Sequence, residues 1–197
     1  MITRLGFLRL SAALPLFLAA RVWAGEVEVT PFFGLQYGGY LDYPSGQRVG
    51  MEPGMQYGGA VDVGFTGSWS VEVLFARQET EAAGSPRVGL AVERYLAGVR
   101  EEKDVGRARF LGVALLGLTR LVPEGLGGAD EFFTVALGLG VRTSLSRRFG
   151  LRADVRAYYA VVSSGGATGC VNGNCLLLFG GSGIWQGDVT AGLVVAF

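Results

Sequence analysis

The chain has 197 residues, of which half are hydrophobic and only 17% are charged, and its 17 basic and 17 acidic side chains cancel. This balance leaves no basic surface of the kind that nucleic-acid binding requires, and the length suffices for one domain with a sizeable core. Beyond residue 24 no apolar run approaches the roughly 18 to 20 residues that a membrane-spanning helix needs.

The longest apolar run lies at the start of the chain. Residues 1–24 begin with a short stretch containing two arginines, continue with apolar residues from Leu10 to Ala20, and end in the small residue Ala24. This is the layout of a secretory signal peptide cleaved after that alanine; the alternative is an uncleaved helical anchor. Cleavage would leave residues 25–197 as the mature domain, with a net acidic charge because the removed segment holds three arginines and no acid.

After the signal segment, a period of two residues between apolar positions predicts β-strands in eight segments. They are, in chain order, 26–39, 56–66, 69–79, 89–101, 106–119, 131–145, 149–162 and 184–197. In the seventh segment, for example, Leu151 and Val155 fall on one face and Arg152 on the other. The fourth and fifth segments leave the assignment of faces, and hence the strand register, open.

The connections between these segments alternate between long and short. The long ones are rich in Gly, Pro and Ser and lie at about 40–55, 80–88, 120–130 and 163–183, whereas the short ones lie at about 67–68, 102–105 and 146–148. In an up-and-down barrel this alternation places the long loops at one end and the short turns at the other, as in outer-membrane barrels with short periplasmic turns. An even number of strands then leaves both chain ends on the periplasmic side.

The two faces of the expected strands differ in character. One face is apolar and carries aromatic residues near strand ends, as the interfacial girdles of a membrane barrel do: Tyr37, Phe65, Tyr159, Trp185 and Phe197. The other face is rich in Gly, Ala and Thr with isolated charges, which suits the crowded interior of a narrow barrel. We therefore expect an all-β fold, an eight-stranded antiparallel up-and-down transmembrane β-barrel, closed because lipid offers no partner for a sheet edge. A soluble barrel that holds a ligand is the alternative.

Charged residues on the polar face are expected to form a network of ion pairs inside the barrel, since unpaired charges there would be costly. They are Glu28, Asp62, Glu72, Arg142, Arg152, Asp154 and Arg156. Phe32, Leu74 and Tyr158 should fill the lumen further. Because eight strands leave an interior just wide enough for their own side chains, a stable open porin is not expected.

The two cysteines, Cys170 and Cys175, lie in the Gly-rich connection 163–183. An oxidising compartment favours a disulfide between them, which would close a short loop and rigidify its tip. The alternative is metal binding, for which two thiols are a poor site because the chain has no histidine. We expect no metal site and no cofactor.

The chain ends in a strand with an apolar residue at every second position and an aromatic residue at the terminus. These residues are Val189, Ala191, Leu193, Val195 and Phe197. This ending resembles the C-terminal signature of bacterial outer-membrane barrels, which the barrel-assembly machinery reads. Segments 27–39, 71–80 and 178–197 are also similar to those of small, largely uncharacterised exported barrels described as outer-membrane β-barrel or porin-family proteins. The resemblance implies this fold, a location in the bacterial outer membrane, and contact with its lipid and lipopolysaccharide.

Among the functions open to such a barrel, we expect a structural or loop-mediated surface-binding role, because loops on rigid scaffolds carry function. An extracellular ligand would then be the partner. A narrow or gated porin-like channel is the alternative. Lipid-modifying barrel enzymes rely on a histidine base, which this chain lacks, so we do not expect an enzyme. Arg77, Arg87 and Arg120 lie near the bases of the expected loops, where they would meet lipopolysaccharide phosphates or remain solvated surface charges.

Overall fold

The computed structural model describes residues 26–42, 48–82, 88–123, 129–161, 167–171, 174–178 and 183–197. The predicted signal peptide, 1–24, lies outside these ranges. Within them, no helix has the length and apolar composition to cross a membrane.

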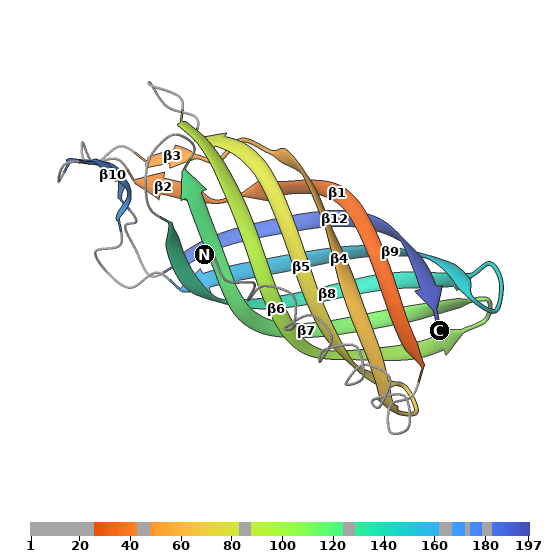
Figure 1. Cartoon of the computed structure of the whole chain (residues 1–197). Helices are drawn as coiled ribbons and strands as arrows, with labels where there is room; N and C mark the ends of the chain where they lie inside the picture. The colour runs from red at the N-terminus through yellow and green to blue at the C-terminus, as the bar shows by residue number, and fades with distance from the viewer. Residues whose placement is uncertain are drawn as a thin grey trace, which may run out of the picture.

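Eight long strands among the described residues close into one barrel (Figure 1). They are β1 (Val27–Gly38), β4 (Gly54–Thr66), β5 (Trp69–Ala82), β6 (Val88–Val105), β7 (Ala108–Pro123), β8 (Asp130–Ser144), β9 (Phe149–Val161) and β12 (Gly183–Ala196). Each strand pairs antiparallel with its neighbours along the chain, and β1 pairs with β12 to close the sheet. The predicted eight-stranded up-and-down barrel is confirmed.

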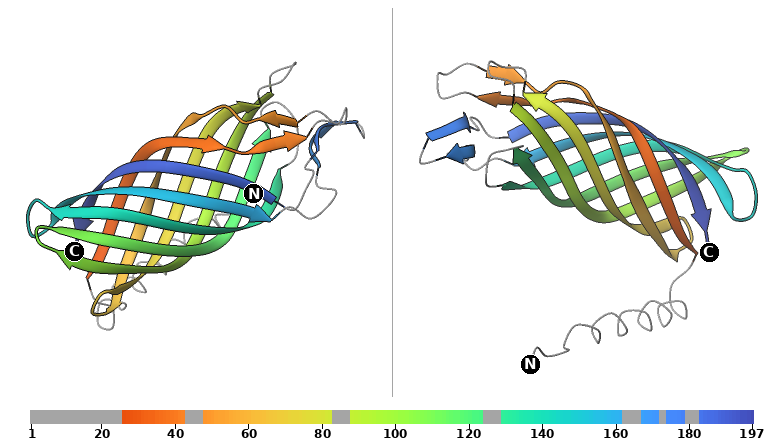
Figure 2. Two further views of the ribbon diagram at one scale, coloured as in Figure 1. Left: turned by 180° about the vertical axis from the view of Figure 1, so that it is seen from behind. Right: turned by 45° about the horizontal axis from the view of Figure 1, so that its top comes forward.

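A small second sheet lies within two of the connections that the sequence predicts as long loops. It is formed by β2 (Tyr40–Asp42), β3 (Arg48–Gly50), β10 (Ala167–Val171) and β11 (Asn174–Leu178), in the order β10-β11-β2-β3. Figure 2 shows it beyond the end of the barrel opposite the C-terminus. The fold therefore gathers its long connections at one end, called here the loop end.

The predicted disulfide falls in this small sheet. The backbone pairing of β10 with β11 sets Cys170 opposite Cys175. The side chains of both residues lie outside the described part of the structure, so the disulfide stays a prediction.

The short connections lie at the other end of the barrel, called here the turn end, together with the start of β1 and the C-terminus. One predicted boundary there is wrong. The strand β6 continues through the expected turn at 102–105, and the tight turn follows at Gly106, whose φ of 66° is in the left-handed region that favours glycine. The added stretch pairs with β7 as far as Val105 opposite Ala108, and its Glu102 forms an ion pair with Arg109 on β7.

The strands present an apolar wall outward and a mixed set of side chains inward. Val155 and Leu193 are about half exposed on the outer wall, whereas Arg152 and Arg156 are buried in the lumen. The structure also settles the faces of the fourth and fifth predicted segments. The inward residues of β6 and β7 include Leu90, Val92, Arg94, Leu96, Arg100, Leu111, Val113 and Leu115.

Candidate functional site

The lumen is filled by side chains that lie in layers between the turn end and the loop end. A charged cluster occupies the turn end; an apolar layer, a polar layer and a second apolar layer follow toward the loops. Because successive inward positions of every strand lie at different heights, each layer collects side chains from several strands.

The charged cluster holds all seven charged residues that the sequence places inside the barrel, together with two from β6. Its members are Glu28, Asp62, Glu72, Arg100, Glu102, Arg142, Arg152, Asp154 and Arg156. Sequence reasoning misses Arg100 because it leaves the faces of the fourth segment open. It misses Glu102 because it places a turn at 102–105. Residues 100–104 are charged at every position, so no period of two residues marks which of these side chains point inward.

Arg152 is the centre of the inner half of this cluster. Its Nη2 donates to Glu72 Oε2 at 2.7 Å, its Nη1 to Asp62 Oδ2 at 3.2 Å and its Nε to Asp154 Oδ1 at 3.0 Å. Arg156 Nη2 lies 3.4 Å from Glu72 Oε1 and 3.3 Å from Asp154 Oδ2. All five side chains are buried, so each charge depends on these partners for compensation.

Arg100 and Arg142 extend the cluster toward the turn end. Arg100 lies 3.0 Å from Glu28, 2.7 Å from Asp62 and 2.7 Å from Glu102. Arg142 pairs with Glu28 and lies 3.4 Å from Glu102. A polar cavity of about 190 Å³ lies beside these side chains and the β4–β5 turn. This part of the cluster is therefore the part nearest to solvent at the turn end.

Two apolar layers separate the charged cluster from the loops. The lower layer consists of Phe32, Leu74, Ala76, Leu96, Val113, Leu115, Ala136 and Tyr158. The upper layer consists of Met51, Leu90, Val92, Leu121, Phe132, Ala160 and Ile184. All of these side chains are buried, so both layers are packed core rather than the lining of a channel.

A polar layer centred on Arg94 lies between the two apolar layers. Arg94 donates to Gln36 Oε1 at 2.6 Å and to Gln186 Oε1 at 2.5 Å. Its guanidinium also lies over the ring of Tyr158, 4.3 Å from the centroid, and the hydroxyl of that tyrosine donates to Asp188 at 2.5 Å. The guanidinium of Arg94 therefore contacts two amide oxygens and the face of an aromatic ring. Asp188 reaches it only through the Tyr158 hydroxyl. Hydrogen bonds and a cation–π contact thus hold this cation in the lumen.

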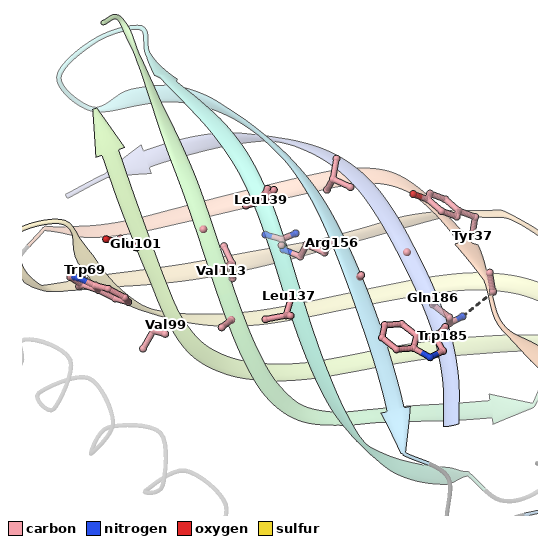
Figure 3. Close-up of a pocket in the computed structure, with 17 residues that line it drawn as sticks. Tyr37, Trp69, Val99, Glu101, Val113, Leu137, Leu139, Arg156, Trp185 and Gln186 are labelled. Carbon is pink, nitrogen blue, oxygen red and sulfur yellow. Dashed lines mark hydrogen bonds between the residues drawn. The ribbon is translucent and has the colours of Figure 1, made fainter. Parts of the chain in front are cut away.

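The outer wall carries a shallow groove of about 870 Å³ that crosses several strands. Figure 3 shows Tyr37 and Trp185 at one end of it and Trp69 at the other. Small residues such as Gly187 and Ala157 form part of its floor, and its lining is mostly apolar. A groove of this kind faces hydrocarbon in a membrane barrel and presents few polar groups for chemistry.

The five residues of the predicted assembly signal share the outward face of β12 and the C-terminus. Val189, Leu193 and Phe197 are exposed apolar side chains, and Ala191 and Val195 alternate with them on the same face. The backbone N–H of Phe197 donates to Val27 O at 2.9 Å, which ties the terminus to the first strand. Their role in recognition by the assembly machinery stays a prediction.

Within the described ranges, no group of three or more His, Cys, Asp or Glu side chains is arranged to hold a metal ion. The carboxylates of the charged cluster are instead engaged by arginines.

The architecture matches solved structures of outer-membrane proteins. Neisserial surface protein A superimposes with a TM-score of 0.65 at 14% identity, covering 88% of this chain and 99% of that one. OprG of Pseudomonas aeruginosa gives a TM-score of 0.56 at 12% identity, covering 88% and 96%. Ail of Yersinia pestis, in complex with the heparin analogue sucrose octasulfate, gives 0.50 at 14% identity, covering 88% and 100%.

No protein-family model matches the chain, and no curated protein matches it in sequence. At these identities the structural similarities establish the fold alone. The chain has the fold of the small bacterial outer-membrane β-barrels, as its sequence predicts.

Proposed function

We propose that this chain is an integral outer-membrane protein whose sealed barrel anchors the long connections at the cell surface, in a structural or loop-mediated binding role. The observation that carries this proposal is the filled lumen. Two buried apolar layers and a buried polar layer lie between the turn end and the loop end, so the loop end is the part free to meet a partner.

The layered interior argues against the porin-like alternative. A hydrated ion entering from the turn end would meet Leu74 and Leu115 in the lower apolar layer and Leu90 in the upper one. Passage would require displacement of packed core side chains, because an eight-stranded barrel has no spare width. The interior therefore supports an anchoring role rather than solute transport.

The same interior argues against catalysis by its carboxylates. Glu72 is fully buried and is held by both Arg152 and Arg156. A general base must reach its substrate and exchange protons, whereas this carboxylate is buried and neutralised. The charged cluster is thus better suited to holding strands together across the lumen.

The loop end supplies the surface for a binding role. The small sheet of β2, β3, β10 and β11 adds backbone pairing beyond the barrel, and the start of β1 and the C-terminus lie at the opposite end (Figure 2). In the export topology expected of outer-membrane barrels, the turn end is periplasmic and this sheet is extracellular. The Ail structure holds a polyanionic heparin analogue, so a sulfated polysaccharide is a reasonable first probe for this chain.

Insertion is part of the proposal as well. We place the C-terminal strand, from Val189 to Phe197, as the segment that the barrel-assembly machinery recognises. The outward row of apolar side chains on this strand is available to a partner before the barrel closes against lipid.

Surface binding is tested on cells that express the chain with residues 162–182, the connection between β9 and β12, replaced by a Gly-Ser linker. The wild-type chain should confer binding of heparin or of host-cell matrix, and the loop variant should lose it. A matched replacement of the turn 145–148 should keep it. Binding that is equal for the loop variant and the wild type would contradict a role for this connection.

A further inference from the structure

Four charged residues form one continuous row across four strands of the outer wall. Backbone pairing sets Arg77 of β5 opposite Glu93 of β6, Glu93 opposite Arg120 of β7, and Arg120 opposite Glu131 of β8. Because neighbouring strands lie about 4.8 Å apart, the two arginines stand roughly 10 Å from each other on the same face. We call these four residues the outer charged row.

The outer charged row borders the apolar belt directly. The neighbouring outward positions, two residues nearer to the turn end on each strand, are Phe75, Tyr95, Leu118 and Phe133, all of them exposed. Aromatic residues at the edge of the belt mark the membrane–water boundary of a barrel. The row therefore lies at the height of lipid headgroups on the loop-end side.

Glu93 holds the row in place. Its carboxylate accepts a hydrogen bond from Arg77 Nη1 at 2.8 Å and another from the Tyr95 hydroxyl at 3.2 Å. Its side chain is only 12% exposed, whereas that of Arg120 is 45% exposed. The carboxylate is thus less exposed than the guanidinium groups beside it and holds that of Arg77 against the wall.

Arg120 retains donors that its carboxylate neighbours do not satisfy. Its Nη1 is 3.9 Å from Glu93 and its Nε is 4.0 Å from Glu131, both beyond hydrogen-bond distance. A guanidinium has five N–H donors in a planar fork. A simple ladder of cross-strand ion pairs would bring these atoms into contact. Among the described residues, the separation instead leaves this exposed guanidinium without a carboxylate at hydrogen-bond distance.

We propose that the outer charged row binds the phosphates of a lipid headgroup such as that of lipid A, with the exposed guanidinium of Arg120 as the principal donor. This rests on the proposed outer-membrane location, in which the loop end faces outward. Arginine recognises phosphate through paired, charge-assisted hydrogen bonds, and the low dielectric of the boundary strengthens them relative to water. Two exposed carboxylates flank the row: Glu79, whose Oε1 lies 3.4 Å from Arg77 Nη2, and Glu131. Divalent cations that accompany such headgroups would lie near Glu131.

The test uses the full mature chain folded in a non-ionic, phosphate-free detergent, titrated with lipid A in the presence of Mg²⁺. Lipid A should bind the wild type and raise the temperature at which the folded, fast-migrating band is lost. The double variant Arg77→Gln/Arg120→Gln should bind at least about tenfold more weakly, the loss expected for one strong charge-assisted contact. Lipid A stripped of both phosphates should not bind.

Matched variants make the result specific. Arg147→Gln/Arg148→Gln removes the same charge from exposed positions at the turn end and should bind lipid A like the wild type. Arg120→Gln alone removes no carboxylate hydrogen bond, so it should fold normally and still weaken binding. Three results would each overturn the proposal. The first is lipid A binding that is unchanged in both Arg120 variants. The second is an equal loss of binding in the Arg147/Arg148 variant, and the third is binding of phosphatidylglycerol as tight as that of lipid A. A chain that folds and reaches the outer membrane but fails these tests would refute the lipid site alone.

Discussion

Arg152 of β9 and Glu72 of β5 meet across the lumen, with Nη2 2.7 Å from Oε2, and their side chains are 1% and 0% exposed. The two strands are not neighbours in the barrel. The contact therefore joins opposite parts of the wall that no backbone hydrogen bond connects. The charged cluster thus stabilises the barrel across the lumen as well as compensating buried charges.

Replacing Glu72 by Gln should lower the free energy of unfolding by about 3 to 5 kcal/mol, because two buried arginines would lose a charged partner. Urea unfolding in lipid vesicles, followed by the loss of the fast-migrating folded band, measures the change. The control is Glu79→Gln on the same strand, where the side chain is exposed and the expected change is within about 0.5 kcal/mol. Similar stability of the two variants would show that the cluster is not a structural tie.

Two glycines on adjacent strands should respond in opposite ways to alanine. A Cβ on Gly98 would lie 2.1 Å from the carbonyl oxygen of Ala114, whereas a Cβ on Gly112 would meet nothing within 4 Å. We expect Gly98→Ala to lower the free energy of unfolding by about 1 to 3 kcal/mol through overpacking. The Gly112→Ala variant should be unchanged or stabilised by up to about 1 kcal/mol. The same urea titration distinguishes them, and equal effects would argue that β6 and β7 do not approach as closely as described.

Arginine substitutions on the outer wall should depend on depth. Leu137 lies near the middle of the outward positions of β8 and is 63% exposed; Leu137→Arg should destabilise the barrel in a bilayer by about 2 to 4 kcal/mol. At Thr143, near the turn end of the same strand, the same substitution should be nearly neutral, at about 0 to 1 kcal/mol. If the two variants unfold at the same urea concentration in vesicles, the wall between these positions does not face hydrocarbon.

The wild-type chain should give no sizeable single-channel conductance in planar bilayers, because several filled layers lie in series along the lumen. Leu74→Ala opens space in the lower apolar layer only, so this variant should remain closed as well. The measurement uses purified wild-type protein at voltages that leave the bilayer intact. Steady conductance steps would support the porin-like alternative instead.

The eight barrel strands could be predicted because one face of each had to be apolar for lipid. The sequence left the faces of β6 and β7 open, and the structure shows why. Inward Leu96 and outward Val99 are both apolar, since these strands contribute to apolar layers in the lumen as well as to the outer wall. A period of two residues disappears when both faces are apolar.

The interior network was only partly accessible from the sequence. Its seven predicted members have clear alternation around them, but the polar layer depends on which residues of distant strands lie at the same height. The contact of Arg94 with Gln36 and Gln186 joins three strands. The shear of the barrel places these residues at the same height, and it cannot be predicted from the sequence of any single strand. The small sheet was missed because strands as short as the three residues of β2 and β3 give no periodicity.

Collisional accessibility of nitroxide labels tests most directly whether the apolar wall faces hydrocarbon. Labels are attached to single cysteines at Val155, Leu193 or Glu79, in a background that carries Cys170→Ser and Cys175→Ser, and the protein is folded into vesicles. Oxygen should relax the first two labels strongly and a water-soluble nickel chelate weakly, with the opposite order at Glu79. Preferential access of the nickel chelate to the labels at Val155 and Leu193 would show that this wall faces water, and the outer-membrane assignment would fail.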